Sequence, residues 1–148
     1  MRTSRYRYSL VDKGPDQPGR ASVLYDADCG FCRWSLAKLL AWDRGRRLRP
    51  VAIDSTEGGR LLSTLNDEKR VSSWHLIGPD GRRHSAGAAA APLLRTLSGG
   101  APLAALLERF PSATEGAYAW VAAHRSRLGR LIPAAAKRRA DARIRRRS

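Results

Sequence analysis

The chain has 148 residues, of which 43% are hydrophobic and 28% are charged, and its formal net charge is +15. This length is enough for one domain with a sizeable core, and the apolar runs are far shorter than the roughly 18 to 20 residues that span a bilayer. Most of the charge lies near the C-terminus, where residues 124–148 hold ten Lys/Arg against one acid, Asp141. We therefore expect a soluble globular protein whose domain proper is only mildly basic.

The first segments predict a lead-in, a strand and a helix. Residues 1–20 mix Arg, Pro, Gly and Asp without a sustained period, which predicts a flexible lead-in. No apolar stretch follows their basic residues, so we expect no secretory signal. We therefore expect a cytoplasmic location. Residues 22–27, SVLYDA, are β-branched, apolar and aromatic, as in a buried strand. Asp28 is then placed to cap a helix, whose apolar stripe is Phe31, Leu36, Leu39 and Leu40.

The middle of the chain continues this alternation. Residues 47–54, RLRPVAID, predict a second strand, and strand, helix and strand form a βαβ unit with parallel strands and a right-handed crossover. Residues 55–67 predict a short helix. Residues 72–87 predict a hairpin, because Pro-Asp-Gly at 79–81 suits a tight turn in which the glycine takes a positive φ. Residues 88–100 predict a further helix, which gives the order βαβαββα.

The C-terminal part predicts added helices and a basic tail. Residues 101–110 and 112–132 have helical patterns, and in the second of these the apolar face is interrupted by Arg125. Residues 133–148 carry seven Lys/Arg, and such dense like charge predicts a disordered or frayed helical tail. The expected organisation is thus a lead-in over residues 1–20, a domain over residues 21–132 and a basic tail.

Cys29 and Cys32 are the only cysteines, and they lie at the expected start of the first helix. Residues i and i+3 share one face of a helix, so the two sulfur atoms can meet at disulfide distance. The free amides and the helix dipole stabilise a thiolate at Cys29, which is the attacking form of the residue. Cys32 is placed to attack a mixed disulfide at Cys29 and release the product.

The pair has three other interpretations. A structural disulfide over so short a loop constrains the unfolded chain little, and in a reducing compartment it would not form. A zinc site needs four ligands, and the remaining candidates, His75, His84 and His124, have irregular separations. Two inert buried cysteines are the third interpretation. The position between a strand and a helix favours a redox pair, with the metal site and the inert pair as the alternatives left open.

Two aspartates precede the cysteines. Asp26 and Asp28 are two residues apart at the end of a strand, so both should point toward the cysteines. Asp28 is explained as a helix cap, although its charge opposes a thiolate at Cys29. Asp26 ends an otherwise apolar strand, where a carboxylate is costly without a partner or a role. Our hypothesis is that Asp26 moves the proton of Cys32 during its attack on the mixed disulfide.

This arrangement resembles the thioredoxin-like superfamily, whose core order is βαβαββα with CxxC opening the first helix. The motif YDADCGFC, with Asp26, Cys29 and Cys32 at DxxCxxC spacing, is similar to the DCC family of predicted thiol–disulfide oxidoreductases, over about residues 22–128. The resemblance implies a thioredoxin-like fold with a dithiol–disulfide site at the two cysteines. One departure is that the superfamily usually has a cis-proline before its third strand, where this chain has Val71, Ser72 and Ser73. This departure argues against peptide binding of the thioredoxin type.

The sequence therefore predicts an α/β protein with a thioredoxin-like core and additional C-terminal helices, which catalyses thiol–disulfide exchange. Its partners would be a protein or small-molecule thiol or disulfide substrate and a dithiol reductant, and no nucleotide, flavin or metal motif indicates a cofactor. The alternative is a thioredoxin-like interaction module with idle cysteines, whose basic tail binds nucleic acid or an anionic surface.

Overall fold

A computed structural model describes residues 19–148, so residues 1–18 of the predicted lead-in lie outside the described residues. Its centre is a four-stranded sheet with the strand order β2-β1-β3-β4. β1 pairs with β2 in parallel, and β3 pairs with β1 and with β4 in antiparallel fashion. The strands are β1 (Ala21–Tyr25), β2 (Leu48–Ala52), β3 (His75–Ile77) and β4 (Arg83–Ser85).

The predicted βαβ unit is confirmed by β1, α1 (Gly30–Trp42) and the parallel strand β2. Pro50 is tolerated within β2 because this strand lies at the edge of the sheet, where one side of its backbone needs no ladder hydrogen bond. Successive residues of β1 face opposite sides of the sheet. Val23 packs into the larger core with α1, whereas Leu24 packs into a smaller cluster with Val51 and Leu62.

Two short helices connect β2 to β3, where the sequence predicted one. α2 (Thr56–Leu61) begins after Ser55, whose Oγ accepts a hydrogen bond from the Gly58 amide at 3.0 Å. α3 (Asp67–Ser72) begins after Asn66, whose Oδ1 accepts from the Lys69 amide at 2.9 Å. The predicted hairpin is confirmed by β3 and β4, with Gly81 at a φ of +78° in the turn between them.

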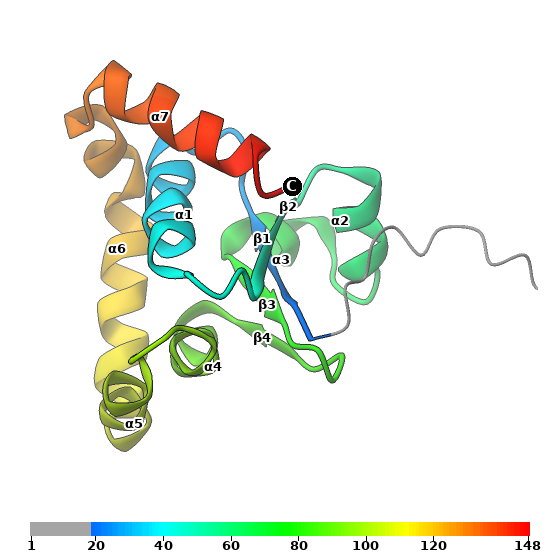
Figure 1. Ribbon diagram of the computed structural model, residues 1–148, viewed down its shortest axis with the longest axis vertical. Helices are drawn as coiled ribbons and strands as arrows, with labels where there is room; N and C mark the ends of the chain where they lie inside the picture. Colours follow the sequence, from blue (N-terminus) through cyan, green and yellow to red (C-terminus); the bar gives the residue numbers. More distant parts are fainter. Residues whose placement is uncertain (1–18) are drawn as a thin grey trace, which may run out of the picture.

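Helices make up the rest of the described chain and cover one side of the sheet. A 3-10 turn, η1 (Ala86–Ala89), precedes α4 (Ala90–Thr96). The helices α6 (Pro111–Leu131) and α7 (Ala134–Arg145) lie beside α1, whereas α2 lies on the other side of the sheet (Figure 1). Within residues 19–148, no helix has both the length and the apolar character needed to cross a bilayer. Between α4 and α6 lies α5 (Ala101–Arg109).

Residues 133–148 form an ordered helix, not the disordered or frayed helical tail that their charge predicts. They contain α7, which packs against α1 along its length (Figure 1). Ala140 and Ile144 are buried, and because they are four residues apart they share one face of the helix. Most of the basic side chains remain in contact with solvent, where their repulsion is screened, while the apolar face joins the core and Arg147 is buried beside Asp43. Apolar packing thus holds in place a helix whose charge alone favours disorder.

Candidate active site

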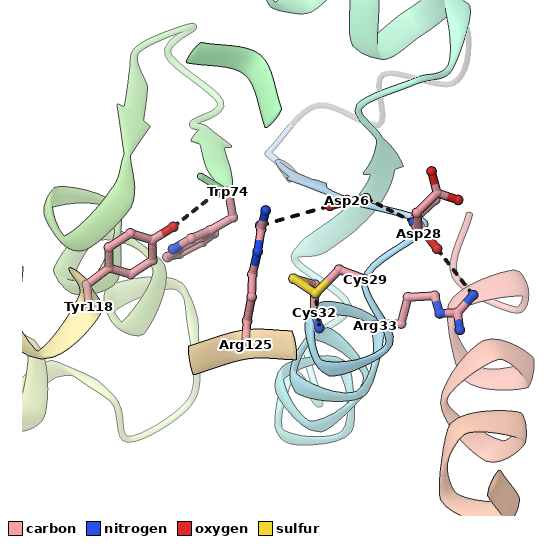
Figure 2. The surroundings of a disulfide bond; sticks show 9 residues. Asp26, Asp28, Cys29, Cys32, Arg33, Trp74, Tyr118 and Arg125 are labelled. Atoms are coloured by element: carbon pink, nitrogen blue, oxygen red, sulfur yellow. Dashed lines mark hydrogen bonds and ion pairs between the residues drawn. A yellow bond between two sulfur atoms is a disulfide. The ribbon is translucent and has the colours of Figure 1, made fainter. Parts of the chain in front are cut away.

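Cys29 and Cys32 lie at the junction of β1 and α1 and form a disulfide, with a Cα–Cα distance of 5.2 Å (Figure 2). Cys29 itself is the N-cap of α1, and its Sγ accepts a hydrogen bond from the Cys32 amide at 3.2 Å. The prediction that Asp28 caps this helix is therefore wrong. The Cys29 amide donates to the Asp26 carbonyl oxygen at 3.3 Å, and this turn starts the helix one residue later. As a result, a cysteine sulfur occupies the capping position and accepts a hydrogen bond from an amide in the first turn of the helix.

Asp26 has two partners in the structure. Its Oδ1 accepts a hydrogen bond from the Asp28 amide at 2.9 Å, and its Oδ2 lies 3.9 Å from Nη1 of Arg125 on α6. Figure 2 shows Arg125 extending from α6 beside the disulfide toward Asp26. The two side chains are 26% and 31% exposed, so the ion pair is partly screened by water. The carboxylate that ends β1 is thus held beside the cysteines without being withdrawn from solvent.

Arg125 reaches the cysteines because α6 approaches the first turn of α1 closely. The contact is made at Gly129, which is buried, and a Cβ at this position would lie 3.3 Å from the backbone nitrogen of Phe31. A larger residue would push the two helices apart. The sequence signal for Arg125 was its interruption of the apolar face of residues 112–132, but only the packing of α6 on α1 shows what this arginine contacts.

An apolar pocket of about 250 Å³ lies on the Cys32 side of the disulfide. It is bounded by α1, by α6 and by the segment that precedes β3. In this segment the Trp74 amide donates to the Tyr118 hydroxyl at 3.4 Å, which joins the segment to α6 (Figure 2). The pocket is lined by Val23, Tyr25, Asp26, Phe31, Cys32, Ser35, Leu36, Leu39, Ser73, Trp74, Tyr118, Val121, Ala122 and Arg125.

A second hollow, of about 340 Å³, lies on the Cys29 side and has a different character. Its walls carry the basic residues Arg125, Arg130 and Lys137 together with Asp26 and Asp28. Lys137 belongs to α7 and approaches the start of α1, since a Cβ on Gly30 would lie 3.6 Å from its Nζ. The disulfide therefore separates an apolar wall from a charged one.

The histidines do not join this site. His75 is buried at 1% exposure, and its ring nitrogens lie 2.7 Å from Ser85 Oγ and 3.0 Å from the Arg70 carbonyl oxygen. Burial lowers the pKa of His75 below its ordinary value, which keeps the ring neutral near neutral pH. His124 stacks on Trp120 along α6, with 4.3 Å between the ring centroids. Within residues 19–148, no three His, Cys, Asp or Glu side chains gather as a metal site.

The order of elements, the mixed sheet and a CxxC disulfide between the first strand and the first helix define a thioredoxin-like α/β protein with additional C-terminal helices. Residues 23–131 match the DCC1-like thiol-disulfide oxidoreductase family, and the chain belongs to this family. The resemblance that the DxxCxxC motif indicated is thereby confirmed. No curated protein and no solved structure shows significant similarity to the chain. α7 lies beyond the matched segment.

Proposed function

We propose that this protein is a thiol–disulfide oxidoreductase that acts by dithiol–disulfide exchange through Cys29 and Cys32. The observation that carries the proposal is the position of Cys29 as the cap of α1, where its sulfur accepts the Cys32 amide. A thiolate at this position receives the same hydrogen bond and the positive end of the helix dipole. The family membership and the disulfide between the two cysteines support the same redox chemistry.

In the reducing direction, the Cys29 thiolate attacks one sulfur of a substrate disulfide. A bond forms between Cys29 and that sulfur, and the other half of the substrate leaves as a thiolate. Cys32 then loses its proton and attacks the Cys29 sulfur, which re-forms the internal disulfide and releases the second half as a thiolate. Two electrons pass from the protein to the substrate, and a partner dithiol returns them by the same exchange.

Asp26 is the group that we propose accepts the proton of Cys32. Its carboxylate lines both hollows that flank the disulfide, and the apolar one also contains Cys32. The hydrogen bond from the Asp28 amide and the pairing with Arg125 keep the carboxylate oriented there. In the oxidising direction the same carboxylate would return the proton to Cys32.

The division of labour between the cysteines is tested with bis(2-hydroxyethyl) disulfide and intact-mass measurement of the reduced protein. We expect wild type to end as the internal disulfide, because Cys32 resolves the mixed disulfide. Cys32→Ser should retain one 2-hydroxyethylthio group on Cys29, and dithiothreitol should remove it. Cys29→Ser is the matched control, and it should react more slowly because its thiol lacks the helix-capping position. A Cys29→Ser variant that reacts as fast as Cys32→Ser would overturn the proposal.

A further inference from the structure

We infer that the apolar pocket beside Cys32 binds a ring-sized apolar group of a small-molecule disulfide substrate. This inference rests on the proposed function and adds to it the class of substrate. Most of the residues that line the pocket are aliphatic or aromatic. They come from β1, α1, α6 and the segment before β3, and they include Phe31, Leu39 and Val121. Water binds such walls weakly, because it finds few hydrogen-bond partners there, so an apolar group displaces it favourably.

The size of the pocket sets the size of the group. Its volume is about 250 Å³, whereas an apolar cavity of about 150 Å³ is enough for benzene. One aromatic ring with a short linker therefore fills the pocket well. Trp74 and Tyr118 keep its far wall in place through the hydrogen bond between the Trp74 amide and the Tyr118 hydroxyl.

The position of the pocket connects this group to the chemistry. Cys32 is part of the wall, and the paired residues Asp26 and Arg125 line both this pocket and the hollow at Cys29. A substrate whose ring occupies the apolar pocket therefore carries its sulfur, one or two atoms away, next to the two cysteines. Such a placement raises the rate by orienting the reacting atoms.

The backbone beside the pocket favours a small molecule over an extended peptide. A peptide bound as an added strand needs free backbone groups along its path. The Trp74 amide is already used by Tyr118, and the Trp74 carbonyl oxygen accepts from the Ala86 amide at 3.2 Å. Within the described residues, the backbone of Trp74 thus has no unpaired group to offer, and the side-chain pocket remains as the source of specificity.

The test compares two probes that share a leaving group. These are 2-phenylethyl 2-hydroxyethyl disulfide, which carries a ring, and bis(2-hydroxyethyl) disulfide, which does not. We expect the reduced protein to react at least about tenfold faster with the ring-bearing probe, after correction for the rates with dithiothreitol, as filling an apolar pocket typically gives. Reaction with the polar probe reports the exchange chemistry alone.

Adjacent alanines of α6 provide the matched variants. Ala122→Phe fills the pocket and should reduce the preference to about twofold or less, whereas Ala123→Phe, at an exposed position, should keep it. As a second measurement, 2-phenylethanol should slow wild-type reaction with the ring-bearing probe but not with the polar one. This measurement uses only the wild-type protein, so it tests the inference even if Ala122→Phe fails to fold.

The outcomes separate the two proposals. If neither probe forms the internal disulfide, the proposed function fails. If both probes react but wild type shows no preference for the ring-bearing probe, the pocket inference is overturned and the proposed exchange chemistry is retained. The same conclusion follows if a folded Ala122→Phe variant keeps that preference. A wild-type protein whose preference is insensitive to 2-phenylethanol also overturns it.

Discussion

At the scale of single residues, the structure gives Asp26 the partners that its position at the end of an apolar strand requires. A carboxylate there is stabilised by the Asp28 amide and by Arg125, and it still faces both cysteines. These contacts leave the Asp26 side chain partly exposed. Asp28 differs, because its side chain is exposed and does not cap the helix. The two aspartates therefore make distinct predictions.

Asp26→Asn should slow the resolving step by roughly 100-fold at neutral pH, because general-base assistance typically contributes about 10² or more. Without the carboxylate, resolution depends on spontaneous ionisation of Cys32, so its rate should rise with pH more steeply than in wild type. Single-turnover decay of the Cys29 mixed disulfide, followed by rapid quench across pH, measures this step. Asp28→Asn is the control and should behave as wild type. An unchanged pH profile in Asp26→Asn would show that Asp26 has no part in proton transfer.

At the scale of elements, α7 is the segment whose behaviour departs most from the expectation. It lies beyond the part of the chain that matches the family, yet it contacts the first turn of α1 through the ion pair between Arg33 and Asp141 at 3.3 Å. It also places Lys137 beside Gly30, at the positive end of the α1 dipole. Within residues 19–148, Lys137 has no ion-pair partner, and it lines the same hollow as Cys29. Binding of nucleic acid or an anionic surface by the other basic residues of α7 stays a prediction.

Lys137→Gln should reduce the thiolate fraction of Cys29 in the reduced protein, because it removes a positive charge that stabilises the thiolate. We expect iodoacetamide to alkylate Cys29 about threefold more slowly at pH 6, an effect of the size that partly exposed charges give. The difference should shrink at high salt. Arg138→Gln, at an exposed position of the same helix, is the control. Equal alkylation rates in the two variants would show that Lys137 does not stabilise the Cys29 thiolate.

α3 is a helix that the sequence analysis did not predict. Its sequence, DEKRVS, has no apolar stripe and none of its residues is buried, so hydrophobic periodicity gave no signal. The helix depends on its cap, in which Asn66 accepts from the Lys69 amide, and on the position of the chain between α2 and β3. A cap before a six-residue polar segment is too weak a pattern to predict a helix by itself.

At the scale of the whole molecule, one buried ion pair joins Arg147, just after α7, to Asp43, the C-cap of α1. Arg147 Nη2 donates at 2.8 Å to Asp43 Oδ2 and at 2.8 Å to the Asp43 carbonyl oxygen, and it donates at 3.1 Å to the Leu40 carbonyl oxygen. Asp43 also accepts from the Arg47 and Leu48 amides, at 3.0 and 2.9 Å. The two side chains are only 8% and 1% exposed. This network fixes both the turn after α1 and the end of α7.

Arg147→Met should lower the free energy of unfolding by about 3 kcal/mol, because it leaves the Asp43 carboxylate buried without its cation. Urea unfolding followed by circular dichroism measures the change. Arg146→Met, at an exposed neighbour, should change stability by less than about 0.5 kcal/mol. Similar unfolding midpoints for the two variants would contradict the structural role of the pair.

The sequence by itself determined the parts of this protein that depend on neighbouring residues. Period-two and helical patterns, together with the Pro-Asp-Gly turn at residues 79–81, predicted the βαβ unit and the hairpin. The spacing of Cys29 and Cys32 at the start of a helix predicted the disulfide, because i and i+3 share one face. These features are local, so a short window of sequence contains the physical information that produces them.

Only the tertiary structure decided what surrounds the cysteines. Arg125 and Lys137 are far from Cys29 in the sequence. Arg125 lies near it because Gly129 lets α6 approach α1 closely. Lys137 lies near it because α7 packs on α1 and buries Ala140 and Ile144. The same packing encloses the apolar pocket at Cys32. Charge density along the tail predicted disorder or a frayed helix, but burial of two apolar residues and pairing of Arg147 with Asp43 give an ordered helix. Long-range packing of this kind has no period that a sequence window can show.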